Sequence, residues 1–266
     1  MPGSDRVPPA ADRVCSDGGV ELPRHFVIRE STHRIHDPLT PAKLARLGEA
    51  LALQPGQQLL DLACGSGELL CTWARDHAIT GVGVDISSAF LRAARARADE
   101  LGVADRVRFE HGDASEVVAS EPVDVASCLG ATWIGGDVLG TLDLLARSVR
   151  AGGMLLVGEP YWLRVPATDD LARACHARDR DEWRTLPELV SSLRGHGMDL
   201  VQLVLADPDD WDAYHGLQWL NLRRWLDANP DDELWPQLRA ELDRAPDDHL
   251  VVREHLGWGV FALIAR

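Results

Sequence analysis

Short apolar runs alternate with amphipathic stretches through the middle of the chain. The runs are rich in leucine, isoleucine and valine and stop at glycine or acidic residues, which is typical of buried parallel strands. The stretches between them repeat their apolar positions with helical spacing. A regular β-α-β-α order of this kind predicts an α/β fold, with a doubly wound, mostly parallel sheet and helices on both faces.

The first half of the chain contains five of the expected strands. They are expected at residues 59–62, 79–86, 107–109, 123–129 and 154–157. Helices are expected over 68–77, over 88–101 after the N-cap Ser87, and from the cap Asp137 to Arg150. Ligands of such sheets bind outside the carboxyl ends of the strands. The residues that follow these strands should therefore converge in space.

The second half is less regular. A helix is expected over 185–197, a sixth strand over 199–206 and a seventh over 258–265. A helical insert of about 207–257 lies between the last two strands. Its aromatic residues recur with helical spacing and are expected to pack between insert and sheet rather than to bind a ligand. They are Trp211, Tyr214, Trp219 and Trp225.

The turn from the first strand into the first helix reads LLDLACGSGELL, residues 59–70. Gly65 and Gly67 let a ligand lie against bare backbone, and the free N–H groups of the following helix attract a carboxylate or phosphate. A G-x-G pair alone fits two cofactor classes. A dinucleotide-binding loop would have a third glycine where Leu70 stands, and here the acid Asp61 precedes the glycines.

The D-x-x-x-G-x-G arrangement from Asp61 to Gly67 resembles motif I of the class I S-adenosylmethionine-dependent methyltransferases. The later signals are similar in order, so the resemblance implies a Rossmann-like methyltransferase domain over 55–266 with S-adenosylmethionine as cofactor. It implies that Asp85 binds the two ribose hydroxyls and that Asp113 meets the adenine amino group. The cofactor-binding residues implied are Asp61, Ala63, Gly65, Gly67, Asp85, Ile86, Asp113, Ala114, Leu129 and Gly130.

Residues 33–44, here called the lid segment, read HRIHDPLTPAKL. Their H-R-I-H-x-P pattern is similar to that of a bacterial subgroup of small-molecule-type methyltransferases, which brings no known substrate with it. The resemblance implies that this segment lies over the cofactor. The domain organisation expected is therefore a flexible tail over 1–24, a lid and helix over 25–54, and the methyltransferase domain over 55–266.

Methyl transfer from a sulfonium is an in-line displacement, and alignment of the reactants alone can supply about 7–11 kcal/mol at best. A base is needed if the acceptor must lose a proton. Glu159 is the first candidate because it follows the fifth strand, and a structural acid that caps a loop is the alternative. His36 in the lid segment is the second candidate, with a packing or capping role as its alternative.

Aromatic residues follow the fourth and fifth strands. Trp133, Tyr161 and Trp162 are expected to line the acceptor pocket and to face the cationic sulfonium. The alternative is that they pack under the helical insert.

The formal net charge of −15 argues against nucleic acid as a partner, because phosphate binding needs a clustered positive surface. The basic group Arg92, Arg95 and Arg97 suits a solvated helix face. No apolar run reaches the roughly 18 residues of a membrane span, and the N-terminus has no apolar signal region. Five cysteines without a C-x-x-C pair favour the reducing cytoplasm. No metal site is expected, since His33 and His36 lack further ligands at a suitable spacing.

Three functions remain open from the sequence. The leading hypothesis is transfer of a methyl group from S-adenosylmethionine to oxygen or nitrogen of a small molecule. A protein of the same fold that binds this cofactor without methylating, as a scaffold or rearrangement catalyst, is the second. A nicotinamide-dependent oxidoreductase is the third, and Leu70 and the lack of a Tyr-x-x-x-Lys pair weigh against it. The oligomeric state is not indicated.

Overall fold

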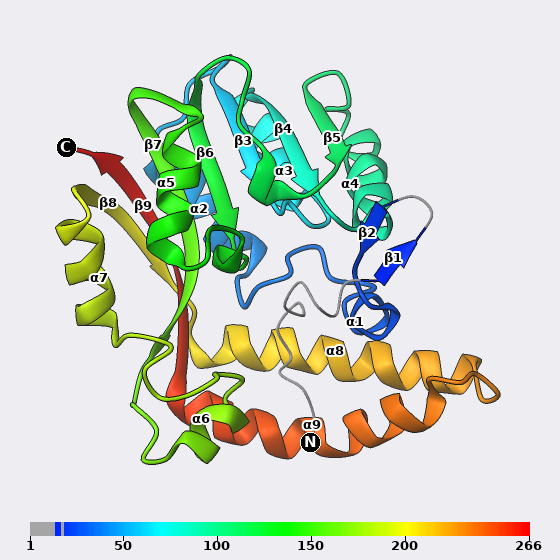
Figure 1. Ribbon diagram of the computed structural model, residues 1–266. Coiled ribbons are helices and arrows are strands. Elements are labelled where there is room, and N and C mark those ends of the chain that lie inside the picture. The colour runs from blue at the N-terminus through cyan, green and yellow to red at the C-terminus, as the bar shows by residue number, and fades with distance from the viewer. Residues whose placement is uncertain (1–13, 17–18) are drawn as a thin grey trace.

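The computed structural model describes residues 14–16 and 19–266, with side chains from Glu21 onward (Figure 1). Its centre is a seven-stranded sheet in the order β5-β4-β3-β6-β7-β9-β8. Neighbouring strands from β5 to β7 pair in parallel, and β9 is antiparallel to both of its neighbours. The expected doubly wound, mostly parallel sheet is confirmed, and its strand order reverses between β3 and β6.

The elements of the sheet domain follow the order expected from the sequence. Its strands are β3 (Gln58–Leu62), β4 (Thr80–Asp85), β5 (Val107–His111), β6 (Val123–Leu129), β7 (Val149–Trp162), β8 (Met198–Leu205) and β9 (Leu256–Ala265). Its helices are α2 (Pro41–Ala50), α3 (Glu68–His77), α4 (Ser88–Glu100), α5 (Val138–Ala146) and α7 (Leu186–Gly195). Short 3-10 turns, η2 (Ala114–Glu116) and η3 (Thr132–Gly135), follow β5 and β6.

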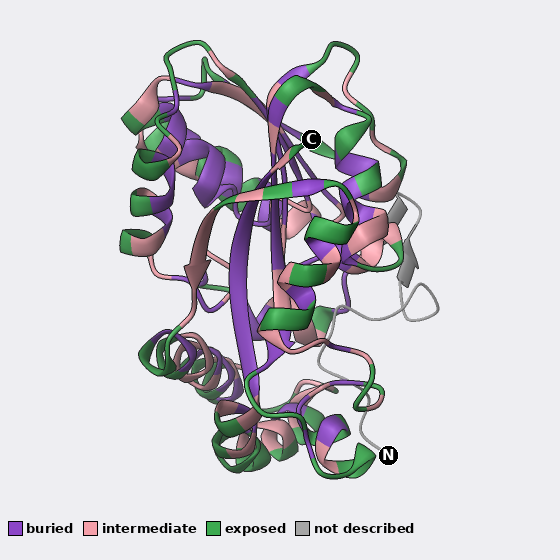
Figure 2. Cartoon of the chain, turned by 90° about the vertical axis from the view of Figure 1, so that its left-hand side faces the viewer, coloured by how far each residue is buried: buried purple, intermediate pink, exposed green. Residues whose placement is uncertain are grey.

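Two apolar layers cover the two faces of the sheet, as the purple strands of Figure 2 show. Along β3, Leu59 packs into the layer that contains residues of α2, α3 and α4, whereas Leu60 and Leu62 pack into the layer that contains residues of α5 and α7. This alternation is the two-residue period of a strand buried on both faces. The expected caps are confirmed: Ser87 Oγ accepts from Phe90 N at 3.3 Å, and Asp137 Oδ1 accepts from Gly140 N at 2.8 Å.

The fifth strand is longer than expected and the helix before it is shorter. α5 ends at Ala146 rather than at Arg150, and β7 already begins at Val149. It continues to Trp162 because β9 pairs with it residue by residue, from Met154 opposite Ile264 to Trp162 opposite Leu256. The pairing partner is a hundred residues away in the chain, so local sequence did not reveal this length.

Two short strands and the first residue of a helix lie within the tail expected over 1–24. β1 (Val14–Ser16) and β2 (Gly19–Glu21) form a two-stranded antiparallel sheet, and α1 (Arg24–Arg29) follows. The side chain of Glu21 accepts a hydrogen bond from Ser88 N at 3.2 Å at the start of α4. Residues 1–13 and 17–18 lie outside the described part of the chain.

The helical insert lies across the carboxyl ends of the strands (Figure 1). It consists of α8 (Pro208–Ala228) and α9 (Trp235–His255), as expected between the last two strands. A second excursion, with α6 (Asp169–Ala174), leaves the sheet after β7 and was not expected. Lys43 of α2 fixes the start of α8: its Nζ donates to Leu205 O at 3.0 Å and to the carboxylates of Asp207 and Asp210.

Candidate functional site

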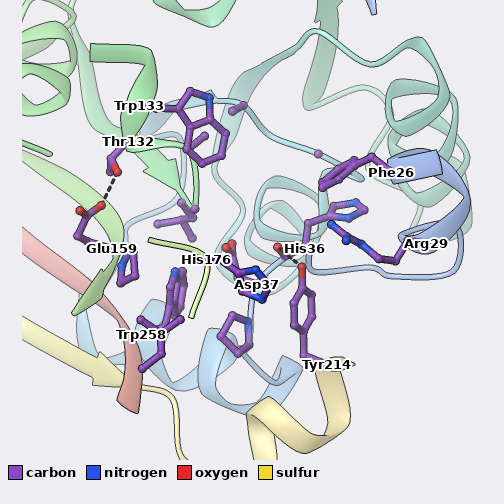
Figure 3. A pocket seen from close by; sticks show the side chains of 18 of the residues that line it. Phe26, Arg29, His36, Asp37, Thr132, Trp133, Glu159, His176, Tyr214 and Trp258 are labelled. Carbon is purple, nitrogen blue, oxygen red and sulfur yellow. Dashed lines mark hydrogen bonds between the residues drawn. The ribbon is translucent and has the colours of Figure 1, made fainter. Parts of the chain in front are cut away.

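A cavity of about 610 Å³ separates the strand ends from the insert. Its volume is in the range of about 300–1,000 Å³ that is usual for small-molecule sites. Strand-end residues form one side, which we call the donor side, and α1, α8, α9 and the loop after α6 form the other, which we call the acceptor side. Figure 3 shows how side chains from these distant segments point into one space.

The first strand-to-helix turn is held by Asp85, at the end of β4. One of its oxygens accepts from Gly65 N at 2.8 Å and the other from Ser87 N at 2.8 Å. The carboxylate is 6% exposed and lines the cavity. Each oxygen has two lone-pair directions, so both can accept a further hydrogen bond from a bound hydroxyl. Asp85 thus shapes the turn and still has acceptor capacity for a ligand.

The lid segment lies directly on the glycines of the donor side. A β-carbon on Gly65 would lie 2.6 Å from His36 Cδ2, and one on Gly130 would lie 1.9 Å from Asp37 Oδ1. Both glycines have positive φ, +53° and +72°. Only glycine permits this backbone shape together with so close a contact. The lid segment is therefore packed against the glycine turn and against Gly130.

His36 is held at both ring nitrogens. Its Nδ1 lies 3.4 Å from Glu30 Oε2 and its Nε2 lies 2.9 Å from Ser66 Oγ. The ring also packs on Phe90, with 4.1 Å between ring centroids. With a carboxylate at Nδ1, this nitrogen donates and Nε2 accepts from the serine hydroxyl. This geometry suits a residue that holds the lid in place better than a free base.

Glu30 joins α1, the lid segment and α8. It is 1% exposed, and its Oε1 accepts from Gln218 Nε2 at 2.7 Å and from Tyr214 Oη at 3.3 Å. Burial alone would raise its pKa, but the hydrogen bond from His36 and the nearby His33 and Arg29 hold the pKa at about 2. Glu30 is therefore a buried carboxylate on which three segments converge. Tyr214 Oη also donates to His36 O at 3.2 Å (Figure 3).

Two buried carboxyl groups, those of Asp61 and Asp85, and the partly buried carboxyl group of Asp37 surround the glycine turn. Burial raises the pKa of Asp37 to about 7. Burial also raises the pKa of Asp61 to about 7, against the hydrogen bond from Ser127, and the charges of Asp85 and Asp37 add to the rise. The pKa of Asp85 is raised as well, mainly by burial. Such a cluster is poised to attract a cation, because a positive ligand relieves the repulsion among the carboxylates.

Glu159 faces the cavity from β7. Thr132 Oγ1, at the start of η3, donates to Glu159 Oε2 (Figure 3), and Thr141 Oγ1 donates to Thr132 O at 2.6 Å. This chain of hydrogen bonds orients the carboxylate beside Trp133, which also lines the cavity. Both the catalytic and the structural interpretation of Glu159 fit this arrangement.

Most of the site residues expected from the sequence line the cavity. They are His36, Ala63, Gly65, Asp85, Ile86, Asp113, Ala114, Leu129, Gly130, Trp133 and Glu159. Asp61 and Gly67 do not. Asp61 is 4% exposed and accepts from Ser127 Oγ at 2.6 Å beneath the turn. Gly67, with φ of +70°, starts α3 where a β-carbon would lie 2.7 Å from the Phe109 ring. These two shape the turn from below.

The expected acceptor residues Tyr161 and Trp162 are buried outside the cavity, which corrects that expectation. Each is 2% exposed, and they belong to opposite apolar layers. Trp162 Nε1 donates to Arg180 O at 2.9 Å, and the Tyr161 ring packs over Gly257. Both lie on the long end of β7 that pairs with β9. Their role in this structure is the packing alternative.

Sequence reasoning missed several residues of the cavity. Asp37 stands beside His36 in the lid segment, and its position next to a candidate residue was the available signal. Tyr214 and Trp219 line the cavity, Trp211 lines it and also packs in the apolar layer with residues of β9 as expected, and Trp225 packs with the apolar residues between α8 and α9. Further residues of the acceptor side are His176, His215, His249 and Trp258, which no local motif marked.

Two further findings bear on ligands and location. Within the described part of the chain, no group of three or more His, Cys, Asp and Glu side chains is arranged to hold a metal ion. None of the helices among residues 21–266 has the length and apolar character to cross a membrane.

Known proteins resemble this chain closely. The methyltransferase domain family matches residues 59–153. A SAM-dependent methyltransferase from Geobacter sulfurreducens, solved in complex with S-adenosyl-L-homocysteine, is 57% identical, with a TM-score of 0.92 over 92% of this chain and 99% of its own. The protein YjhP of Escherichia coli (strain K12) is 53% identical over 93% of this chain and 100% of its own length. The ubiquinone biosynthesis O-methyltransferase of Cupriavidus pinatubonensis (strain JMP 134 / LMG 1197) is 30% identical over 73% of this chain and 81% of its own length.

Proposed function

Since this chain belongs to the family of S-adenosylmethionine-dependent methyltransferases, we propose that it methylates oxygen or nitrogen of a small molecule held in the cavity. The observation that carries this proposal is that the glycine turn, Glu159 and the insert line one cavity. Donor and acceptor would then meet inside the protein, away from bulk water.

The donor side fits the cofactor. Gly65 and Gly130 present backbone without a side chain, and Asp85 keeps lone pairs for the ribose hydroxyls. Asp113, whose Oδ1 accepts from Ser115 N at 3.0 Å, lines the cavity where the adenine amino group is implied. S-adenosylmethionine, when bound, supplies the methyl group on a positively charged sulfur. The carboxyls of Asp37 and Asp61 lower the energy of that charge.

Glu159 acts on the acceptor in this proposal. A neutral hydroxyl or a protonated amine must lose a proton when its oxygen or nitrogen is methylated, and a carboxylate can accept that proton. Thr132 holds the Glu159 carboxylate in one orientation, so it can align the acceptor as well.

A small acceptor is favoured by how the cavity is enclosed. The insert helices α8 and α9 cross over the strand ends, and α1 packs along α8 (Figure 1). Aromatic residues from the insert and from β9 line the acceptor side, including Trp211, Trp219 and Trp258. We place the reaction in the cytoplasm, because the four cysteines whose side chains the structure describes form no disulfide with one another.

Titration calorimetry with S-adenosylmethionine and S-adenosylhomocysteine tests the donor half of this proposal. A methyl-labelled donor is then incubated with the protein and separate extracts of small metabolites, protein and RNA. We expect binding of both cofactor forms and label in the small-metabolite fraction alone. Failure to bind either form contradicts the donor assignment, and label in protein or RNA contradicts the small acceptor.

A further inference from the structure

The part of the cavity wall formed by α8 and α9 contains buried polar atoms that the described residues leave without a partner. His249 is 4% exposed and lines the cavity, yet its Nδ1 has no hydrogen-bond partner among them. Trp211 and Trp219 line the same wall, and their indole nitrogens likewise have no hydrogen-bond partner among the described residues. Native proteins rarely leave buried polar atoms unpaired, so these three point to a ligand.

The other nitrogen of His249 fixes the proton on its ring. His249 Nε2 lies 2.7 Å from Asp212 Oδ1, and Arg253 donates to the same carboxylate at 2.9 and 3.1 Å. The hydrogen bonds from Arg253 and, next, from His249 lower the pKa of Asp212 to about 2. An ionised carboxylate can only accept, so Nε2 carries a hydrogen. In the neutral ring Nδ1 is then a lone-pair acceptor.

Aromatic rings pack against His249, and the charged residues Glu241, Arg244 and Asp248 of α9 line the cavity beside it. The His215 ring lies 4.6 Å away between centroids and is tilted by 35°, and the Trp219 ring makes an edge contact at 5.6 Å. Burial lowers the pKa of His215 to about 3, and the nearby His249 and His176 act in the same direction. His215 is therefore neutral at physiological pH. A wall that contains two imidazoles and two indoles suits a planar ring.

We propose that His249 Nδ1 accepts a hydrogen bond from a hydroxyl or N–H group of the acceptor, which is a molecule with a flat ring. This inference rests on the proposed function and names its substrate class. His249 is a specificity-determining residue, and Asp212 is a positioning residue that keeps it in the accepting tautomer. In this arrangement Glu159 deprotonates or orients the reacting atom of the acceptor, next to the donor side. His249 binds a polar group at the opposite end of the acceptor.

The chain contains a matched control. His196 Nε2 lies 2.8 Å from Asp143 Oδ1, in the same arrangement of histidine and carboxylate. This pair is on the surface after α7, and neither residue lines the cavity. His196→Phe therefore removes an equivalent imidazole without touching the proposed site.

The test compares two pairs of probes that differ only in the donor group: 2-naphthol with 2-methoxynaphthalene, and indole with 1-methylindole. Binding to the full chain saturated with S-adenosylhomocysteine is measured by calorimetry. At least one probe that carries O–H or N–H should bind about fivefold or more tightly than its methylated partner, because the partner leaves Nδ1 unpaired. If the naphthol pair shows the difference, the methyl acceptor donates a hydroxyl group to His249. If the indole pair shows it, the methyl acceptor donates an N–H group.

Variants distinguish a hydrogen bond to His249 from general packing of the probe in the cavity. His249→Phe and His249→Gln should reduce the discrimination to less than about twofold, and Asp212→Asn should weaken it, whereas His196→Phe should retain it in full. In ¹⁵N-histidine NMR, His249 Nδ1 should be unprotonated and should shift when the discriminating probe is added. Asp212 is half-exposed, so its variant remains informative if the His249 variants do not fold.

The inference is overturned if no probe binds, if each pair binds equally, or if the discrimination survives in His249→Gln and Asp212→Asn. These outcomes are distinct from failure of the proposed function, because the same titrations begin with S-adenosylhomocysteine alone. If that ligand does not bind, the donor assignment fails. If it binds and the probes do not discriminate, the acceptor class alone fails.

Discussion

The two sides of the cavity are built in different ways. The donor side consists of strand-end turns, where backbone N–H groups, glycines and carboxylates from β3 to β7 meet at one edge of the sheet. The acceptor side consists of side chains from α1, α8, α9 and the loop after α6. One side presents backbone and carboxylates, and the other presents mainly aromatic rings and imidazoles.

The donor side has features that follow from the fold, whereas the acceptor side has features that depend on the insert of this chain. The donor side depends on the geometry of a parallel sheet, in which consecutive strands end at the same edge. The acceptor side depends on how an insert packs, and insertions of this kind carry specificity in many folds. Variants on the donor side should therefore change cofactor affinity and rate, and variants on the acceptor side should change which molecule is methylated.

The largest effect is expected where the two sides meet. Glu159→Gln keeps the volume of the side chain but removes its charge, and turnover should fall by about 10²–10⁴-fold if the carboxylate deprotonates or orients the acceptor. The loss should shrink as pH rises, since a more deprotonated acceptor needs the base less. Single-turnover rates measure the effect, and Glu110→Gln on the exposed edge strand is the control. A parental rate would assign Glu159 to its structural role.

Asp85→Ala tests the donor side alone. Loss of charged hydrogen bonds to the ribose should weaken cofactor binding by about 1.5–3 kcal/mol. The same change removes the acceptor of Gly65 N and Ser87 N, so the turn itself should also loosen. Calorimetry measures the affinity, with Asp105→Ala on an exposed loop as the control. Unchanged affinity would remove Asp85 from the site and contradict the placement of the cofactor.

The carboxyls around the glycine turn predict a pH dependence for the donor side. The pKa values of Asp37 and Asp61 are both about 7, so raising the pH from 6 to 8 ionises them. The sulfonium of S-adenosylmethionine is positive and the thioether of S-adenosylhomocysteine is not. The ratio of the affinity for S-adenosylmethionine to the affinity for S-adenosylhomocysteine should therefore rise about three- to tenfold from pH 6 to pH 8.

Variants of Asp37 sharpen this expectation. Asp37→Asn removes one of the titrating groups and should flatten the ratio of the two affinities against pH, whereas Asp199→Asn on the surface should not. Calorimetry at matched ionic strength gives both affinities at each pH. A ratio that is constant in the parent protein, or that rises equally in Asp37→Asn, would contradict an electrostatic role for Asp37.

The smallest effect is expected at Tyr161. Tyr161 packs in the core and does not line the cavity. Tyr161→Phe should therefore leave the KM for the acceptor within about twofold of the parent value. Trp133→Ala, in contrast, should raise KM, since Trp133 lines the cavity. Steady-state kinetics with the identified acceptor compare the two. A large rise in KM for Tyr161→Phe would restore the acceptor role expected from the sequence.

The same contrast explains how far the sequence alone could go. Asp85, Gly130 and Glu159 were found because each lies at or just beyond the end of a strand expected from the sequence, and such ends are readable from local patterns. Tyr161 was misplaced because the length of β7 depends on pairing with β9. Trp219 was taken as core because helical spacing is identical for a core and for a cavity wall, and Trp211 serves as both. What packs opposite a helix face is decided by tertiary structure.

Glu30 makes the two sides of the cavity one thermodynamic unit. The lid segment over the donor site and α8 of the acceptor site share this one buried charge, through His36 on one side and Gln218 on the other. Movement of either segment alone would leave the carboxylate short of a partner, so the lid and the insert cannot open independently at low cost. Linkage then requires a reciprocal effect. The factor by which bound cofactor raises the affinity for the acceptor equals the factor by which bound acceptor raises the affinity for the cofactor.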